Sequence, residues 1–173
     1  ATKFILPQFG GTPAVGNTAM LCFQLLLLLG YLYAHVLTST LKPKFQILTH
    51  AALIIIACVA LPVLFTAPPS AQISNEPIRS LIWELLQGVG LQFFCVAATA
   101  PLLQRWVSYS NSPLASKPYV LYSASNLGSM SALIGYILLI EPNATVSHQI
   151  AGWGYLFAAV SLVLIMFAYC MSG

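Results

Sequence analysis

The stretch that decides the fold is PYVLYSASNLGSMSALIGYILLIEP, residues 118–142. It is long enough to cross a bilayer as a helix, which takes about 20 mostly apolar residues. It carries no charged residue between Lys117 and Glu141. Its first half nevertheless contains several polar side chains, namely Tyr119, Tyr122, Ser123, Ser125, Asn126 and Ser129. Because hydrocarbon offers these groups no hydrogen-bond partner, we expect them to face protein, water or a ligand.

The composition of the whole chain points to the same environment. Of its 173 residues, 59% are hydrophobic and only 5% are charged, whereas soluble domains average about 25% charged residues. The sequence therefore predicts an all-α, polytopic transmembrane helical bundle embedded in a lipid bilayer. The net charge of +3 is thinly spread along the chain, which argues against nucleic-acid binding.

Five segments are long and apolar enough to be spanning helices: residues 13–40, 46–65, 77–109, 117–141 and 146–171. They leave no room for a second domain, so residues 1–173 are expected to form a single transmembrane domain. Pro101, inside the third segment, is expected to kink that helix. Both chain ends read as limits of a longer protein, with one further helix expected before Ala1.

Basic residues in the predicted loops are distributed unevenly between the two ends of the bundle. One end carries Lys42, Lys44, Arg105 and Lys117, and the other carries Lys3 and Arg79. Because cytoplasmic loops of membrane proteins are enriched in Lys and Arg, we expect residues 41–46 and 105–117 to lie in the cytoplasm.

The first predicted helix carries a polar stripe. Asn17, Gln24 and Tyr31 recur at seven-residue intervals and His35 follows four residues later, so the four side chains lie on one face. One interpretation is that they form interhelical hydrogen bonds that fix packing. The other is that they line a polar path or a binding groove.

On the third predicted helix, helical spacing favours a shared face for five residues: Glu84, Gly88, Gln92, Cys95 and Thr99. Glu84 is the only acid well inside a predicted span, and carboxylates inside membranes are often functional. However, it lies one to two turns from the predicted outer end, so it could simply reach the interface. Both interpretations of Glu84 remain open.

The fourth predicted helix carries a ridge of small residues, Ala124, Gly128 and Ala132. Such ridges allow helix backbones to approach closely in membranes. Tyr122 and Asn126 are expected to lie beside the ridge. We interpret this face as a packing seam, with ligand contact as the alternative.

No pattern of catalytic or metal-binding residues emerges. Cys22, Cys58, Cys95 and Cys170 occur singly, without spacing suited to a metal. His35 and His50 lie near the inner ends of consecutive helices, and bis-histidine haem ligation would need them to face each other. Nothing else in the sequence supports a pigment or haem, so no cofactor is expected. We also expect no enzymatic activity.

Three stretches in combination resemble a known family: residues 6–35, 98–106 and 118–142. They are similar to the membrane domain of bacterial fused spermidine-synthase-like proteins, in which several transmembrane helices precede a soluble aminopropyltransferase-like domain. The resemblance implies a multi-pass protein of the bacterial inner membrane. This chain departs from the family at Gly16, where family members usually show Trp. The soluble transferase domain, with its glycine-rich loop and acidic polyamine-binding residues, has no counterpart in this sequence.

Two functional hypotheses follow. The first is a non-catalytic structural or accessory subunit of a larger membrane protein assembly, which would bind other membrane subunits. The alternative is a transporter-like module for polyamines or other small solutes. A cationic substrate would call for acidic side chains, and the predicted spans offer Glu84 alone.

Overall fold

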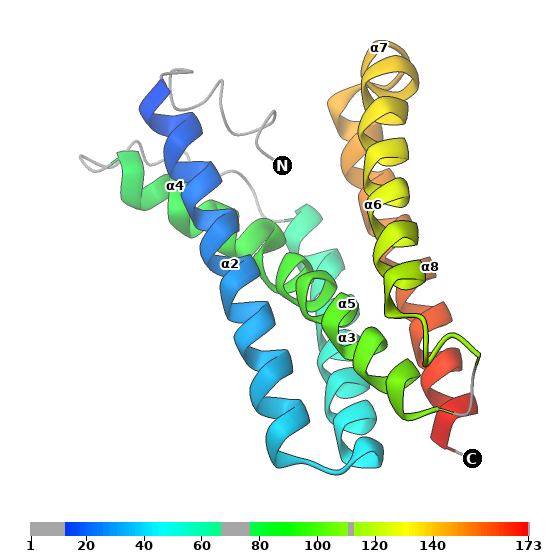
Figure 1. The fold of residues 1–173 in the computed structure, drawn as a ribbon. Helices are drawn as coiled ribbons and strands as arrows, with labels where there is room; N and C mark the ends of the chain where they lie inside the picture. The colour runs from blue at the N-terminus through cyan, green and yellow to red at the C-terminus, as the bar shows by residue number, and fades with distance from the viewer. Residues whose placement is uncertain (1–12, 67–76, 111–112, 173) are drawn as a thin grey trace.

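The computed structural model describes residues 13–66, 77–110 and 113–172, and this part of the chain is helical throughout, apart from the short connections. The helices form a bundle (Figure 1). The elements are α2 (Pro13–Thr40), α3 (Pro43–Thr66), α4 (Pro77–Leu85), the π-helix η2 (Leu86–Gly90), α5 (Leu91–Tyr109), α6 (Pro118–Gly135), the π-helix η3 (Tyr136–Ile140), α7 (Glu141–Asn143) and α8 (Val146–Ser172). The predicted fold class is confirmed.

These elements combine into five helical segments, because α4, η2 and α5 follow one another without a break, as do α6, η3 and α7. Four stretches are long and apolar enough to cross a membrane: Pro13–Thr40, Pro43–Ala60, Ile78–Tyr109 and Tyr119–Asn143. Within the described residues of α8, the apolar part is shorter, His148–Leu164. Helix α3 begins at Pro43, before the predicted start at residue 46, because proline is well tolerated in the first turn of a helix.

The segments run up and down, so their ends gather in two groups. The α2–α3 connection, the α5–α6 connection and the end of α8 lie at the lower end in Figure 1, and the starts of α2 and α4 lie at the upper end with α7. Lys42 and Lys117 belong to the lower connections, Lys44 lies in the first turn of α3, and Arg105 lies in the last turns of α5. The basic residues of the described chain are therefore concentrated at one end of the bundle.

Helix α2 packs along α4 and α5 through a continuous apolar stripe. Its buried residues recur every three or four positions and are Val15, Ala19, Cys22, Leu26, Gly30, Ala34 and Leu37. The upper part of this stripe contacts Leu81 and Leu85 of α4, and the lower part contacts Leu102 and Trp106 of α5. This spacing matches the period of one helix face, so packing fixes which side of α2 faces inward.

Helix α8 covers α3 and α5 from the other side. Phe157 of α8 is buried together with Ile54 and Ala57 of α3 and Cys95 of α5. Consequently α3 and α5 form the centre of the bundle, with α2 on one side and α8 on another (Figure 1).

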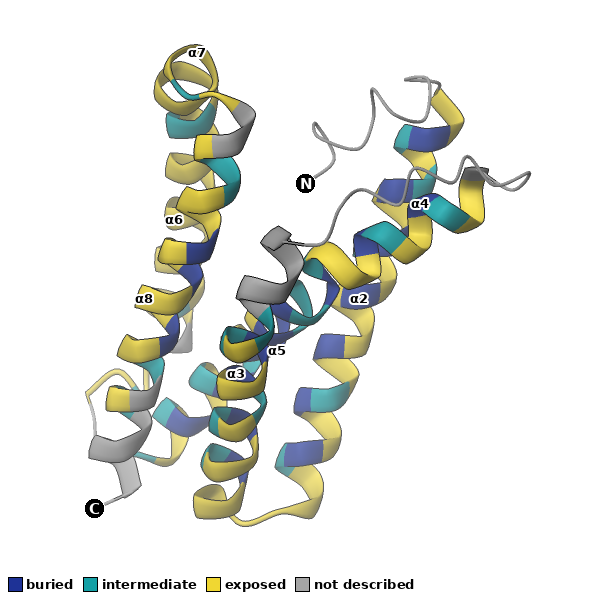
Figure 2. Cartoon of the chain, turned by 180° about the vertical axis from the view of Figure 1, so that it is seen from behind, coloured by how far each residue is buried: buried dark blue, intermediate teal, exposed yellow. Residues whose placement is uncertain are grey.

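Helix α6 contributes nothing to this core. No residue in the most apolar window of Tyr119–Asn143 is buried (Figure 2). The segment is tied to α8 at its upper end, where Tyr136 Oη donates a hydrogen bond to Gln149 Oε1 over 3.1 Å. Thr145 precedes α8 and accepts a hydrogen bond from the His148 backbone N–H over 3.4 Å, which is the geometry of an N-cap.

Gly30 allows α2 and α5 to approach each other closely. A Cβ atom on Gly30 would lie 3.0 Å from Ala97 Cβ and 3.2 Å from the Ala98 backbone nitrogen. Both neighbours belong to α5 and neither atom can rotate away. Gly30 therefore permits α2 and α5 to pack backbone against backbone, as small residues do in membrane bundles.

We predict that Gly30→Ala destabilises the bundle by about 1–3 kcal/mol, the usual cost of overpacking a filled interface. Gly128→Ala is the matched control, because a Cβ on Gly128 meets nothing within 4 Å and the intrinsic helix preference changes equally in both variants. The measurement is the unfolding free energy of each purified variant in detergent or bicelles. Equal stability of the two variants would contradict the close α2–α5 contact.

Candidate functional site

A column of polar contacts joins α3 to α5 through the middle of the bundle. We call it the polar ladder and define it by four contacts, Gln46 with Trp106, His50 with Thr99, the Leu53 carbonyl with Cys95, and the Ala57 carbonyl with Gln92. The α3 members rise in number as the α5 members fall, because the two helices are antiparallel. The ladder thus fixes the register of one helix against the other.

The first contact closes the lower end of the ladder. Trp106 Nε1 donates a hydrogen bond to Gln46 Oε1 over 3.0 Å, and Gln46 Nε2 donates to the Leu41 carbonyl over 2.7 Å. Gln46 is only 1% exposed. Its amide is therefore paired at both its oxygen and its nitrogen, and it connects α5 to the α2–α3 turn.

The second contact indicates which ring nitrogen of His50 carries the hydrogen. His50 Nε2 lies 3.0 Å from Thr99 Oγ1, and Thr99 Oγ1 donates to the Cys95 carbonyl over 2.7 Å. A hydroxyl has one hydrogen, so towards His50 the Thr99 oxygen accepts. We infer that His50 carries its hydrogen on Nε2, which leaves Nδ1 as an acceptor.

The two upper contacts are weaker. Cys95 Sγ lies 4.0 Å from the Leu53 carbonyl, and Gln92 Nε2 lies 3.4 Å from the Ala57 carbonyl. A thiol is a weak donor and the Gln92 contact is long. Gln92 Oε1 is buried and has no partner among the described residues. Hydrogen bonding in the ladder thus becomes weaker from Gln46 upwards.

Aromatic rings enclose His50 within the ladder. The Tyr33 ring of α2 lies 5.9 Å from the His50 ring, and the Trp106 ring lies 6.2 Å from it. Phe94 packs against the Tyr33 ring, with 5.4 Å between the two ring centroids. His50 is 2% exposed as a result. The dielectric constant is low beside these rings, so a buried polar atom that lacks a hydrogen-bond partner there costs more free energy.

The structure places the predicted site residues in three different environments. Gln92 joins the polar ladder together with Cys95 and Thr99. Glu84 is half-buried on α4, above the ladder. The remaining predicted residues are exposed on α2 and α6, and these are Asn17, Gln24, Tyr31, His35, Tyr122, Asn126, Ala124, Gly128 and Ala132.

The shared face expected for residues 84–99 is interrupted by η2. Leu81 and Leu85 before it pack against α2, whereas Cys95 after it packs against α3. A π-helical turn holds more residues than an α-helical turn and so redirects the following side chains. Gly88 lies within η2 and is exposed, which separates it from the face of Gln92.

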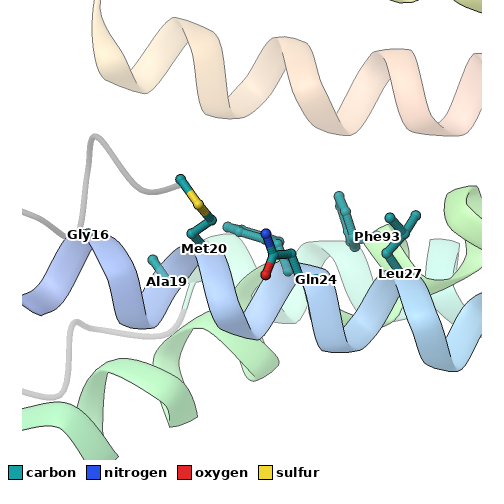
Figure 3. A pocket seen from close by; sticks show the side chains of 7 residues that line it. Gly16, Ala19, Met20, Gln24, Leu27 and Phe93 are labelled. Carbon is teal, nitrogen blue, oxygen red and sulfur yellow. The ribbon is translucent and has the colours of Figure 1, made fainter.

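The polar stripe of α2 lies on the side opposite its buried stripe. At about 100° per residue, Asn17 lies on the far side of the helix from Val15, and the later members follow it. Gln24 borders an open groove of about 380 Å³ lined by apolar side chains, among them Met20, Phe23, Leu27 and Phe93 (Figure 3). The stripe is therefore not part of the packing within this chain.

The two histidines considered for haem ligation lie in different environments. His35 is exposed on α2, whereas His50 is enclosed by Tyr33, Thr99 and Trp106. In the described part of the chain, no cluster of three or more His, Cys, Asp or Glu side chains is suited to hold a metal ion. The ladder itself contains no carboxylate, so its described groups can donate, accept and bind small polar molecules.

Sequence reasoning missed Gln46, Tyr33 and Trp106, and considered His50 only as a haem ligand. The usable signal was paired spacing. Gln46 and His50 lie four residues apart, and Gln92, Thr99 and Trp106 recur at intervals of seven. Ala57 takes part only through its backbone carbonyl, which no sequence pattern marks. Two helices with polar residues at heptad spacing can align them across one interface.

No protein-family model, curated protein or solved structure matches this chain.

We predict that Trp106→Phe destabilises the bundle by about 1–3 kcal/mol, because it leaves Gln46 Oε1 buried without a donor. Trp83→Phe is the matched control, since Trp83 is 60% exposed. Thermal or denaturant unfolding of both variants measures the difference. A loss that is the same for both substitutions would show that the Gln46 contact contributes little.

Proposed function

We propose that this chain is a non-catalytic membrane bundle that serves as a structural or accessory subunit of a larger membrane protein assembly. Its docking element is α6, and the occupants are membrane-spanning helices of a partner protein that cover its two opposite faces. The observation that carries the proposal is that no described residue of α6 is buried within the chain, combined with polar groups that lipid cannot satisfy.

The first support is a polar residue of α6, Asn126. It is exposed, and its side-chain amide makes no hydrogen bond to any described residue. It lies seven residues into the candidate span that begins at Tyr119, about 10 Å along the helix at 1.5 Å per residue. Acyl chains at that depth offer no partner, and polar residues in spans normally face protein or a water-filled space. A partner helix with a polar side chain would satisfy the amide.

The second support is the shape of α6, which carries a ridge of small residues. Ala124, Gly128 and Ala132 give α6 a flat ridge, and the space beside Gly128 is open. A ridge of this kind suits close packing by another helix. Asn126 lies about 200° around the helix from Ala124 at 3.6 residues per turn. Asn126 and the ridge are therefore on nearly opposite faces, not side by side as expected, and the proposed assembly covers α6 on both.

The proposal also covers the orientation of the bundle in the membrane and the family that the chain resembles. The basic end with Lys42, Lys44, Arg105 and Lys117 supports a cytoplasmic location for the α2–α3 and α5–α6 connections. The resemblance of residues 6–35, 98–106 and 118–142 supports kinship with the membrane domain of bacterial fused spermidine-synthase-like proteins. The resemblance favours the bacterial inner membrane as the compartment, and the basic end favours this orientation within it.

We predict that Gly128→Leu prevents assembly without destabilising the isolated bundle. The matched control is Gly152→Leu on α8, where a Cβ also meets nothing within 4 Å. Assembly is measured in native membranes by the size of the complex after mild solubilisation, and by photo-crosslinking from position 126. The expected results are a smaller complex for Gly128→Leu alone and a crosslinked protein of discrete mass. Crosslinks to lipid alone, with full-size complex in both variants, would overturn the proposal.

A further inference from the structure

We propose that the basic end of the bundle binds anionic phospholipids, with the guanidinium of Arg105 holding a lipid phosphate. Three lysines of the same end, Lys42, Lys44 and Lys117, attract the negative headgroups around it. The inference goes beyond the proposed accessory role, because all four residues lie outside α6 and its docking faces. The occupant is a lipid headgroup of the leaflet that this end of the bundle meets.

Arg105 is held in place while its hydrogen-bond donors stay free. Its Cζ lies 4.6 Å from the centroid of the Tyr109 ring, one helical turn further along α5. This cation–π contact orders the side chain, yet the guanidinium makes no hydrogen bond to any described residue. A guanidinium carries five N–H donors in a planar fork, which binds phosphate through two parallel hydrogen bonds. Arg105 can therefore receive a phosphate with little further loss of side-chain freedom.

The position of Arg105 along α5 matches the level of lipid headgroups. The candidate span Ile78–Tyr109 ends four residues after Arg105, which is about 6 Å along the helix. Arg105 and Tyr109 are both exposed. Arginines near the ends of spanning helices extend to the membrane surface, where tyrosines are also enriched. The phosphate of a phospholipid is therefore the anion that this guanidinium meets in a bilayer.

No acid among the described residues neutralises the basic end. The acids of the described chain are Glu84 in α4 and Glu141 at the start of α7, and α4 and α7 lie towards the opposite end (Figure 1). The side chains of Lys42, Lys44 and Lys117 are exposed and form no ion pair with a described residue. Basic clusters at the cytoplasmic ends of spanning helices attract anionic lipids. Charge complementarity thus favours an anionic lipid over a zwitterionic one, although both carry a phosphate.

The polar ladder keeps two of the basic segments together. Trp106 Nε1 donates a hydrogen bond to Gln46 Oε1 over 3.0 Å, and Gln46 Nε2 donates to the Leu41 carbonyl over 2.7 Å. These bonds connect the residue next to Arg105 to the α2–α3 turn and the start of α3, which carry two of the lysines. The positive charges of α5 and of this turn therefore lie at one level of the bundle, where a single leaflet surface meets both.

Spin-labelled lipids measure the proposed preference directly. The purified full chain is reconstituted in phosphatidylcholine vesicles with a trace of spin-labelled phosphatidylglycerol or spin-labelled phosphatidylcholine. Electron paramagnetic resonance then gives the relative association constant of the two lipids with the protein. We expect the wild-type chain to prefer phosphatidylglycerol several-fold at low salt. The preference should shrink at about 1 M salt, where the Debye length is only about 3 Å.

We expect Arg105→Gln to reduce the preference for phosphatidylglycerol by up to about fivefold, the effect of one basic residue near an anionic surface. Arg79→Gln is the matched control, because it removes one exposed cation from α4, towards the other end of the bundle, and should change the preference little. Arg105→Lys keeps the charge but removes the planar fork, so it should retain only part of the preference. Lys42→Gln/Lys44→Gln leaves Arg105 in place and should reduce the preference several-fold.

Three outcomes would overturn the proposal. Equal association of the two lipids with the wild-type chain would leave an acidic protein segment, and not a lipid, as the partner of the basic end. An equal loss of preference in Arg79→Gln and Arg105→Gln would show that the preference follows the net charge of the chain and not this end. A full preference in folded Arg105→Lys would contradict the assignment of the lipid phosphate to the guanidinium.

Discussion

The arrangement of this bundle depends on the requirement that polar atoms in an apolar interior find partners. The polar ladder meets much of that requirement between α3 and α5, from Gln46 with Trp106 to Gln92 with the Ala57 carbonyl, and leaves Gln92 Oε1 and His50 Nδ1 without a partner among the described residues. Apolar packing alone is tolerant of sliding, because one aliphatic side chain substitutes for another. Directional polar contacts at four positions do not tolerate such sliding. The ladder therefore sets the register against which the other helices pack.

Two backbone features allow α2 and α4 to fit around this centre. Gly30 lets α2 approach Ala97 and Ala98 closely, and η2 turns Leu81 and Leu85 towards α2 while the following residues face α3. These features leave α6 outside the core, connected to α8 by Tyr136 and Gln149. The division into a packed core and an uncovered helix is the physical basis of the proposed accessory role. Among the described residues, Glu84 lies on α4 and is not a member of the ladder.

The fold was predictable because hydrophobic run length and proline positions determine spanning helices locally. The start of α2 at Pro13 and the end of α5 at Tyr109 follow from such signals. The site was only partly predictable. Gln92 and Thr99 were recognised on one face, but their partners on α3 depend on tertiary alignment. The inward side of α2 was missed because its polar stripe was more conspicuous than Gly30 and its apolar neighbours. The π-helix η2 has no clear local sequence signal.

The central claim is that directional polar contacts between α3 and α5 fix the bundle. A double-mutant cycle on His50→Phe and Thr99→Val, measured by unfolding free energy in bilayer-like bicelles, tests it most directly. The account predicts a favourable coupling of about 0.6 kcal/mol and at most about 1.7 kcal/mol, the average and the maximum measured for hydrogen bonds within a membrane protein. Strictly additive effects of the two substitutions, with a coupling indistinguishable from zero, would contradict it.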